Sequence, residues 1–181
     1  MSFVSDHRSA ALNHTAKAVM DVGNSPKILA AAGLVALVIV LWRGWYRPAV
    51  AAVAALCAGA VTADLLKMVF DRPRPPADLS IVSLSGPAFP STHAAATSAV
   101  AAAILMSVVW RTRALRFLVG AVLALLVVFI GACMVYLGGH WPSDVLVGWA
   151  IGIVLGCSIG RLARPEARKP VAGEPTAEPG R

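Results

Sequence analysis

Two polar segments of this chain hold the residue types that phosphoryl transfer requires. The first runs from Lys67 to His93 and joins three cations, Lys67, Arg72 and Arg74, to the sequence Pro-Ser-Thr-His at residues 90–93. Lys and Arg side chains neutralise phosphoryl oxygens. An apolar helix is predicted to begin at residues 90–93, and the first turn of a helix offers unpaired N–H groups and the positive end of the helix dipole. This segment is therefore predicted to bind a phosphate.

The second segment, Gly139 to Asp144, adds a histidine and a carboxylate. Asp144 follows His140 by four residues, and a carboxylate at that spacing can hold an imidazole N–H, fix its tautomer and raise its basicity. With His93 from the first segment, the chain has two imidazoles. One can attack phosphorus while the other protonates the leaving oxygen, and cations and backbone N–H groups neutralise the remaining oxygens.

Each of these residues also has a simpler structural interpretation. A lysine at the end of an apolar helix often serves only as a membrane anchor, and Asp64 lies three residues before Lys67, on the same helix face, where the two can pair. Ser91 or Thr92 is a good helix N-cap, and Ser143 is a candidate cap after His140. The chemical interpretation is favoured because all of these groups are predicted to lie on one face of a membrane.

The composition indicates an integral membrane protein. Of the 181 residues, 58% are hydrophobic and only 14% are charged, which is too much apolar surface for a soluble domain of this length. The formal charge of +7 does not indicate nucleic acid binding, because the basic residues lie between apolar stretches and not on one amphipathic face.

Five apolar stretches, each near the ~20 residues that a membrane-spanning helix needs, predict an all-α bundle of about five transmembrane helices. They lie at about 28–46, 48–68, 93–110, 116–138 and 144–161. The chain is accordingly divided into three parts: residues 1–26, 27–162 and 163–181. The first is predicted to be an amphipathic helix on the membrane surface, with a solvated tail as the alternative. The second is the transmembrane domain, and the third is predicted to be a disordered cytoplasmic tail.

The distribution of Lys and Arg predicts the orientation. Ten of these residues flank one end of the five stretches and six flank the other. The first group is Arg43, Arg47, Arg111, Arg113, Arg116, Arg161, Arg164, Arg168, Lys169 and Arg181, and the second is Arg8, Lys17, Lys27, Lys67, Arg72 and Arg74. The side with more positive charge is usually cytoplasmic. The C-terminus is therefore predicted to be cytoplasmic, and both polar segments are predicted to face the periplasm or outside of a bacterial inner membrane.

At these residues the sequence resembles the type 2 phosphatidic acid phosphatase superfamily, which shares its site with vanadium haloperoxidases. The first family motif, Lys, six residues, Arg-Pro, corresponds to Lys67 and Arg74-Pro75. The second, Pro-Ser-Gly-His, corresponds to residues 90–93, and the third, Ser-Arg, five residues, His, three residues, Asp, corresponds to His140 and Asp144. The resemblance covers about residues 28–162, with the motifs in the family's order and spacing.

The resemblance implies a role for each matching residue. His140 is similar to the nucleophile that forms a phosphohistidine, Asp144 to its orienting partner and His93 to the general acid. Lys67, Arg74 and the groups at Ser91 and Thr92 are implied to hold the phosphate. No cofactor or metal is implied, and the chain lacks the cluster of acidic residues and histidines that a two-metal site needs.

Two positions depart from the family pattern. Thr92 replaces glycine, for which a small effect is expected because a helix start has negative φ. Cys133-Met134 replaces Ser-Arg, so one expected arginine is missing at Met134. Arg72, which is not part of the motif, is a candidate to bind the phosphate instead.

The sequence therefore predicts a membrane-embedded, metal-independent lipid phosphatase. Its expected substrate is a polyprenyl diphosphate such as undecaprenyl diphosphate, phosphatidylglycerol phosphate or phosphatidic acid. The main alternative is a non-catalytic relative that binds a phospholipid headgroup. It is considered because Met134 replaces the arginine of the third motif. A vanadate-dependent oxidase and a transporter are weaker alternatives. The oligomeric state is left open.

Overall fold

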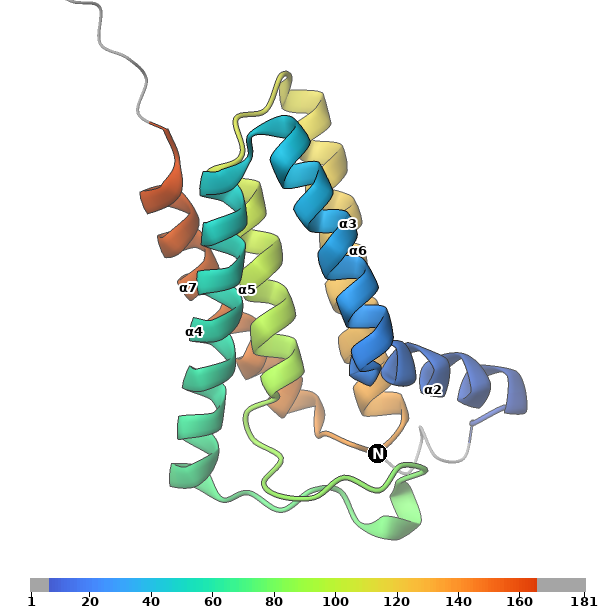
Figure 1. The fold of residues 1–181 in the computed structure, drawn as a ribbon. Coiled ribbons are helices and arrows are strands. Elements are labelled where there is room, and N and C mark those ends of the chain that lie inside the picture. Colours follow the sequence, from blue (N-terminus) through green and yellow to red (C-terminus); the bar gives the residue numbers. More distant parts are fainter. Residues whose placement is uncertain (1–6, 166–181) are drawn as a thin grey trace, which may run out of the picture.

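The computed structural model describes residues 7–165, and these residues form helices joined by loops, with no strand among them (Figure 1). The elements are α2 (Ala10–Asn24), α3 (Pro26–Arg43), α4 (Tyr46–Phe70), the short 3-10 helix η1 (Ala77–Leu79), α5 (Thr92–Ser107), α6 (Arg113–Tyr136) and α7 (Pro142–Ala163). The predicted all-α fold is confirmed. The predicted tail lies outside the described residues from 166 onward.

Helices α3 to α7 correspond to the five predicted apolar stretches. Three of them, α4, α6 and α7, are long and apolar enough to cross a membrane, whereas α5 and the apolar part of α3, Ala30–Arg43, are shorter. Large apolar side chains on the outer faces of these helices, such as Leu34 on α3 and Leu125 on α6, are exposed. Exposed apolar side chains along such helices are expected where the surrounding solvent is lipid.

Helices α5 and α7 pack closely because α7 presents a glycine every fourth residue to α5. A Cβ at Gly152 would contact the Ala95 carbonyl and the Ser98 hydroxyl of α5, and a Cβ at Gly156 would contact the Ala99 carbonyl. Gly148 and Gly160 make equivalent close approaches one turn to either side. Small residues that repeat at this spacing let two helix backbones approach each other in a membrane.

The ends of four helices and the long loop of residues 71–91 meet at one end of the bundle (Figure 1). There, α4 and α6 end and α5 and α7 begin, so both predicted polar segments are brought together. Helix α2 lies across the direction of the other helices at this same end (Figure 1). That position is compatible with the predicted surface helix, which stays a prediction.

Arg8 attaches the start of α2 to this end of the bundle. Its guanidinium donates hydrogen bonds to the Tyr136 carbonyl, at 2.8 Å from Nη2, and to the Leu79 carbonyl, at 2.7 Å. Tyr136 in turn donates a hydrogen bond from its hydroxyl to Asn13, at 2.9 Å. The end of α6, the loop and α2 are therefore linked through one arginine.

Candidate active site

Lys67 lies in the last turn of α4, and its ammonium reaches the start of α5. Its Nζ donates a hydrogen bond to the Thr92 hydroxyl at 2.6 Å, and that hydroxyl donates to Asp64 Oδ1 at 2.7 Å. Lys67 Nζ also lies 3.4 Å from Asp64 Oδ1, as the i, i+3 spacing predicted. Thr92 is therefore a polar bridge between a cation and a carboxylate.

Helix α5 begins at Thr92, with Ser91 as its N-cap. The buried Ser91 hydroxyl accepts a hydrogen bond from Ala94 N at 3.4 Å, and Ser91 N donates to the Asp144 carbonyl at 3.0 Å. Of the two predicted caps, Ser91 is the one used. Thr92 does not have a positive φ, as expected at a helix start, so its backbone conformation does not require glycine.

His93 is the second residue of α5. Its side chain is exposed to solvent, whereas that of His140 is buried. It lies within electrostatic range of His140, Lys67 and Arg74. The structure thus brings together two histidines and two cations that lie between residues 67 and 140 of the sequence.

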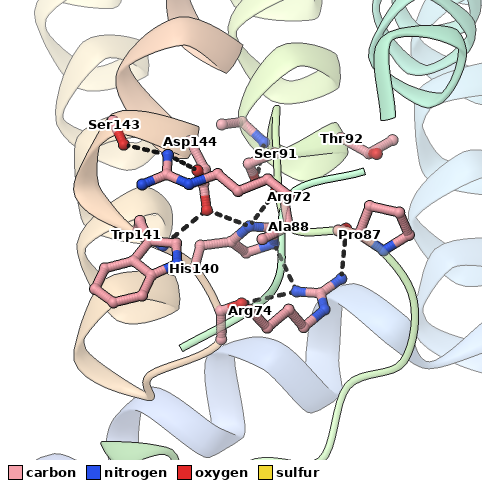
Figure 2. A network of polar contacts seen from close by, with 12 residues as sticks. Arg72, Arg74, Pro87, Ala88, Ser91, Thr92, His140, Trp141, Ser143 and Asp144 are labelled. Carbon is pink, nitrogen blue, oxygen red and sulfur yellow. Dashed lines mark hydrogen bonds and ion pairs between the residues drawn. The ribbon is translucent and has the colours of Figure 1, made fainter. Parts of the chain in front are cut away.

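His140 is buried, and its two ring nitrogens have different surroundings (Figure 2). Nδ1 lies 2.9 Å from the Ala88 carbonyl oxygen, which can only accept, and Nε2 lies 3.4 Å from Arg74 Nη1, which can only donate. Both contacts require the same neutral tautomer, with the proton on Nδ1 and the lone pair on Nε2. Nε2 is therefore the nitrogen available to attack an electrophile.

Asp144 is fully buried at the start of α7, and each of its oxygens has a donor. Oδ2 accepts from Trp141 N at 2.8 Å, and Oδ1 accepts from Arg72 Nη1 at 2.8 Å. The distance from Asp144 Oδ2 to His140 Nδ1 is 3.6 Å, longer than a hydrogen bond. The nearer acceptor for Nδ1 is the Ala88 carbonyl, so Asp144 lies beside the imidazole and is held by other groups.

Arg74 forms hydrogen bonds with main-chain carbonyl groups around the imidazole. Its guanidinium donates to the carbonyl oxygens of Gly139, at 2.7 Å, and Gly86, at 3.0 Å. Burial lowers the pKa of the Arg74 guanidinium from its usual value, and the nearby Asp144 carboxylate opposes part of this shift. A guanidinium titrates so far above neutral pH that Arg74 stays charged. It provides positive charge next to His140 Nε2.

Arg72 lies on the other side of His140 from Arg74 (Figure 2). Besides Asp144, its Nη1 donates to the Ser143 hydroxyl at 2.7 Å. Ser143, the alternative cap that the sequence offered, does not cap α7, because the helix begins at Pro142 with Trp141 as its N-cap.

Met134, at the position where the family motif has arginine, is buried in an apolar cluster. It packs with Ala94 of α5 and Val145 of α7, and Met20, Ile130 and Trp149 surround them. The departure from the motif is thus accommodated by apolar packing.

A polar cavity of about 410 Å³ lies next to the site. Arg74 and Gly139 line it, together with Ser80, Ser83 and neighbouring residues of the loop. The groups that the sequence did not reveal are mostly main-chain atoms, above all the Ala88 carbonyl. A backbone carbonyl is present at every residue, so no sequence signal could have identified this one.

The fold and the arrangement of these residues define a helical membrane protein with a histidine, lysine and arginine site at one end of its bundle. A family model, the PAP2 superfamily, matches residues 48–166, and the chain belongs to this superfamily. That is the family that its three motifs resemble.

Two solved structures have similar folds. One is described as the first transmembrane PAP2 type phosphatidylglycerolphosphate phosphatase from Bacillus subtilis; it is 22% identical, has a TM-score of 0.74, and the match covers 87% of this chain and 79% of that chain. The other is LpxE from Aquifex aeolicus, which is 24% identical, with a TM-score of 0.67 and coverage of 87% and 90%. No curated protein sequence matches the chain. The protein is an integral membrane protein.

Proposed function

We propose that this protein is a metal-independent lipid phosphatase that hydrolyses a phosphate monoester or diphosphate through a phosphohistidine at His140. The observation that carries the proposal is the pair of contacts made by the two ring nitrogens of His140. Its Nδ1 proton is held by the Ala88 carbonyl, so the Nε2 lone pair faces the cationic side of the site, where Arg74 Nη1 is 3.4 Å away. A buried imidazole held in this way is a preorganised nucleophile.

The other residues have distinct roles in this proposal. Lys67, Arg74 and the N–H groups at the start of α5, near Ser91 and Thr92, hold the phosphoryl oxygens. His93 protonates the leaving oxygen and then activates the water that hydrolyses the phosphohistidine. Its solvent exposure suits a group that must exchange protons with water. Asp144 keeps the start of α7, and with it His140, in position.

A lipid substrate fits the position of the site. The site is at one end of the helical bundle, where a lipid can leave its tail in the bilayer and present its phosphate. One of the two similar solved structures is described as a transmembrane phosphatidylglycerolphosphate phosphatase. The polar cavity beside Arg74 has room for the polar part of a headgroup. We propose polyprenyl diphosphate, phosphatidylglycerol phosphate and phosphatidic acid as candidate substrates.

We further propose that the protein resides in a bacterial inner membrane, with the site facing the periplasm and the C-terminus in the cytoplasm. The support is the excess of Lys and Arg at the bundle end opposite the site. Cysteine labelling at Ala77, in the loop beside the site, would test this orientation. Labelling of Ala77→Cys by a membrane-impermeant reagent in intact spheroplasts is expected, and protection there would contradict it.

The activity is tested by phosphate release from the three candidate lipids in detergent, with a metal chelator present. The wild-type protein is expected to release phosphate and His140→Ala to release none. An acid-labile phosphoenzyme that forms in the wild type and is absent from His140→Ala would identify the intermediate. Release that survives in His140→Ala would contradict the proposed nucleophile.

The second candidate function is a non-catalytic protein that binds a phospholipid headgroup. The specific observation in its favour is Met134, which puts an apolar cluster where the family motif has a cation. This candidate predicts binding of the same lipids by the wild-type protein without any phosphate release.

A further inference from the structure

We infer that Arg72 is a positioning residue, which fixes the imidazole of His140 through Asp144 and Ala88 and does not itself hold the phosphate. The family motif assigns no role to this position, and the sequence suggested direct phosphate binding. The inference deepens the proposed function and rests on it, because it concerns the same histidine.

The side chain of Arg72 holds Asp144. Arg72 Nη1 lies 2.8 Å from Asp144 Oδ1, and the carboxylate is completely buried. A buried carboxylate needs a charged or hydrogen-bonded partner on each oxygen, and here the second oxygen is taken by Trp141 N. Arg72 is thus the cation that pairs with the Asp144 carboxylate and orients it beside His140.

The main chain of Arg72 holds the other group next to the imidazole. The Arg72 carbonyl accepts a hydrogen bond from Ala88 N at 2.8 Å, and the Ala88 carbonyl lies 2.9 Å from His140 Nδ1. One residue therefore positions both acceptors around Nδ1, one through its side chain and one through its backbone.

The guanidinium of Arg72 is restrained on the side of the imidazole away from Nε2. Figure 2 shows it beyond the Asp144 carboxylate as seen from His140, with Arg74 on the Nε2 side. The aromatic rings of Trp141 and Phe89 lie 5.6 and 6.0 Å from its central carbon, distances at which a cation is attracted to a ring. A phosphate bound at Nε2 is thus faced by Arg74.

The consequence of losing Arg72 follows from this geometry. Asp144 Oδ1 would lose its donor while its Oδ2 stays 3.6 Å from His140 Nδ1. An unpaired buried carboxylate takes the nearest available donor, which is the imidazole. His140 would then turn from the Ala88 carbonyl toward Asp144, and Nε2 would leave its position beside Arg74.

A kinetic comparison tests the inference on purified protein in detergent. Arg72→Met is expected to lower kcat about tenfold or more, because the group that holds Asp144 beside the reacting histidine is lost. KM and inhibition by inorganic phosphate should change less than about twofold. Arg72→Lys is expected to recover part of kcat. Arg113→Met, which removes an exposed arginine at the far end of the bundle, is the matched control and should match the wild type.

A double-variant comparison separates positioning from phosphate binding. If Arg72 acts through Asp144, adding Arg72→Met to Asp144→Asn should reduce kcat by less than about twofold further. This double variant also removes the buried charge together with its partner, so it avoids leaving an unpaired carboxylate. The inference would be overturned if Arg72→Met kept its kcat but were inhibited less strongly by phosphate. It would also be overturned if the reductions in kcat of the two single variants multiplied in the double variant.

A third measurement does not depend on turnover. ¹⁵N spectra of histidine-labelled protein, assigned with His140→Gln, are expected to show the Nδ1–H tautomer of His140 in the wild type and a mixture of tautomers in Arg72→Met. An unchanged tautomer in Arg72→Met would overturn the inference. A wild-type protein that hydrolyses no lipid would refute the proposed phosphatase, and the tautomer would still decide the role of Arg72.

Discussion

Replacing Thr92 by valine keeps the branched shape of the side chain and removes its hydroxyl. In the structure that hydroxyl accepts a hydrogen bond from Lys67 Nζ at 2.6 Å and donates one to Asp64 at 2.7 Å. Without it, Lys67 keeps only Asp64, 3.4 Å away and on its own helix. The lysine is then drawn back along α4, away from the start of α5 where the phosphate is proposed to bind.

The size of the effect follows from the hydrogen bond to Lys67. A bond to a charged group contributes about 1.5–3 kcal/mol. The bond to Asp64 is not counted, because that side chain is 63% exposed and its interactions are screened by water. Since each ~1.4 kcal/mol changes a rate tenfold, kcat/KM of Thr92→Val should fall by about 10-fold to about 150-fold.

The assay is phosphate release from a short-chain lipid phosphate in detergent micelles, at several substrate concentrations. Thr92→Ser keeps the hydroxyl and should stay within about threefold of the wild type, so it is the matched control. Full activity in Thr92→Val would refute the reasoning. Equal losses in Thr92→Ser and Thr92→Val would also refute it, because the methyl group and not the hydroxyl would then be the important part.

Three further variants test other parts of the structure. His140→Asn should lower kcat by about 10³-fold or more without unfolding the protein, as measured by phosphate release and circular dichroism. Gly152→Val should lower the unfolding temperature in detergent, because the new side chain would collide with α5. Gly33→Val is the control and should leave the unfolding temperature unchanged, because there is open space around Gly33. Equal shifts in the two variants would argue against close α5–α7 packing. Arg8→Met should make α2 more accessible to proteolysis, and unchanged cleavage would show that the Arg8 hydrogen bonds do not retain the helix.

The sequence predicted the fold well because a membrane leaves few choices. Apolar stretches of about 20 residues must form helices, since no water is present to satisfy their backbone groups. The five predicted stretches accordingly agree with α3 to α7. The close packing of α5 on α7 was less evident from the sequence. The glycines repeated from Gly148 to Gly160 show which face of α7 has small side chains, but they do not show which helix packs against that face.

The candidate site was predicted as a set of residues, but not as a set of contacts. Motif spacing selected Lys67, Arg74, His140 and Asp144, and the structure places them at one end of the bundle. The spacing also suggested that Asp144 is the direct partner of His140. Instead, the 71–91 loop supplies the Ala88 carbonyl as the nearer acceptor. The course of such a loop depends on many weak contacts, and the local sequence does not encode it.

The close contact between α5 and α7 has a consequence for how this protein can change over evolution. Helix α5 carries His93 in its first turn and α7 begins two residues after His140, and the two backbones approach so closely at Gly152 that an added side chain there would collide with α5. Their separation is therefore almost invariant under mutation. By contrast, the outer faces of α4 and α6 carry large exposed apolar side chains. Substitutions there can adapt the protein to a different lipid tail while the spacing of the two imidazoles is inherited unchanged.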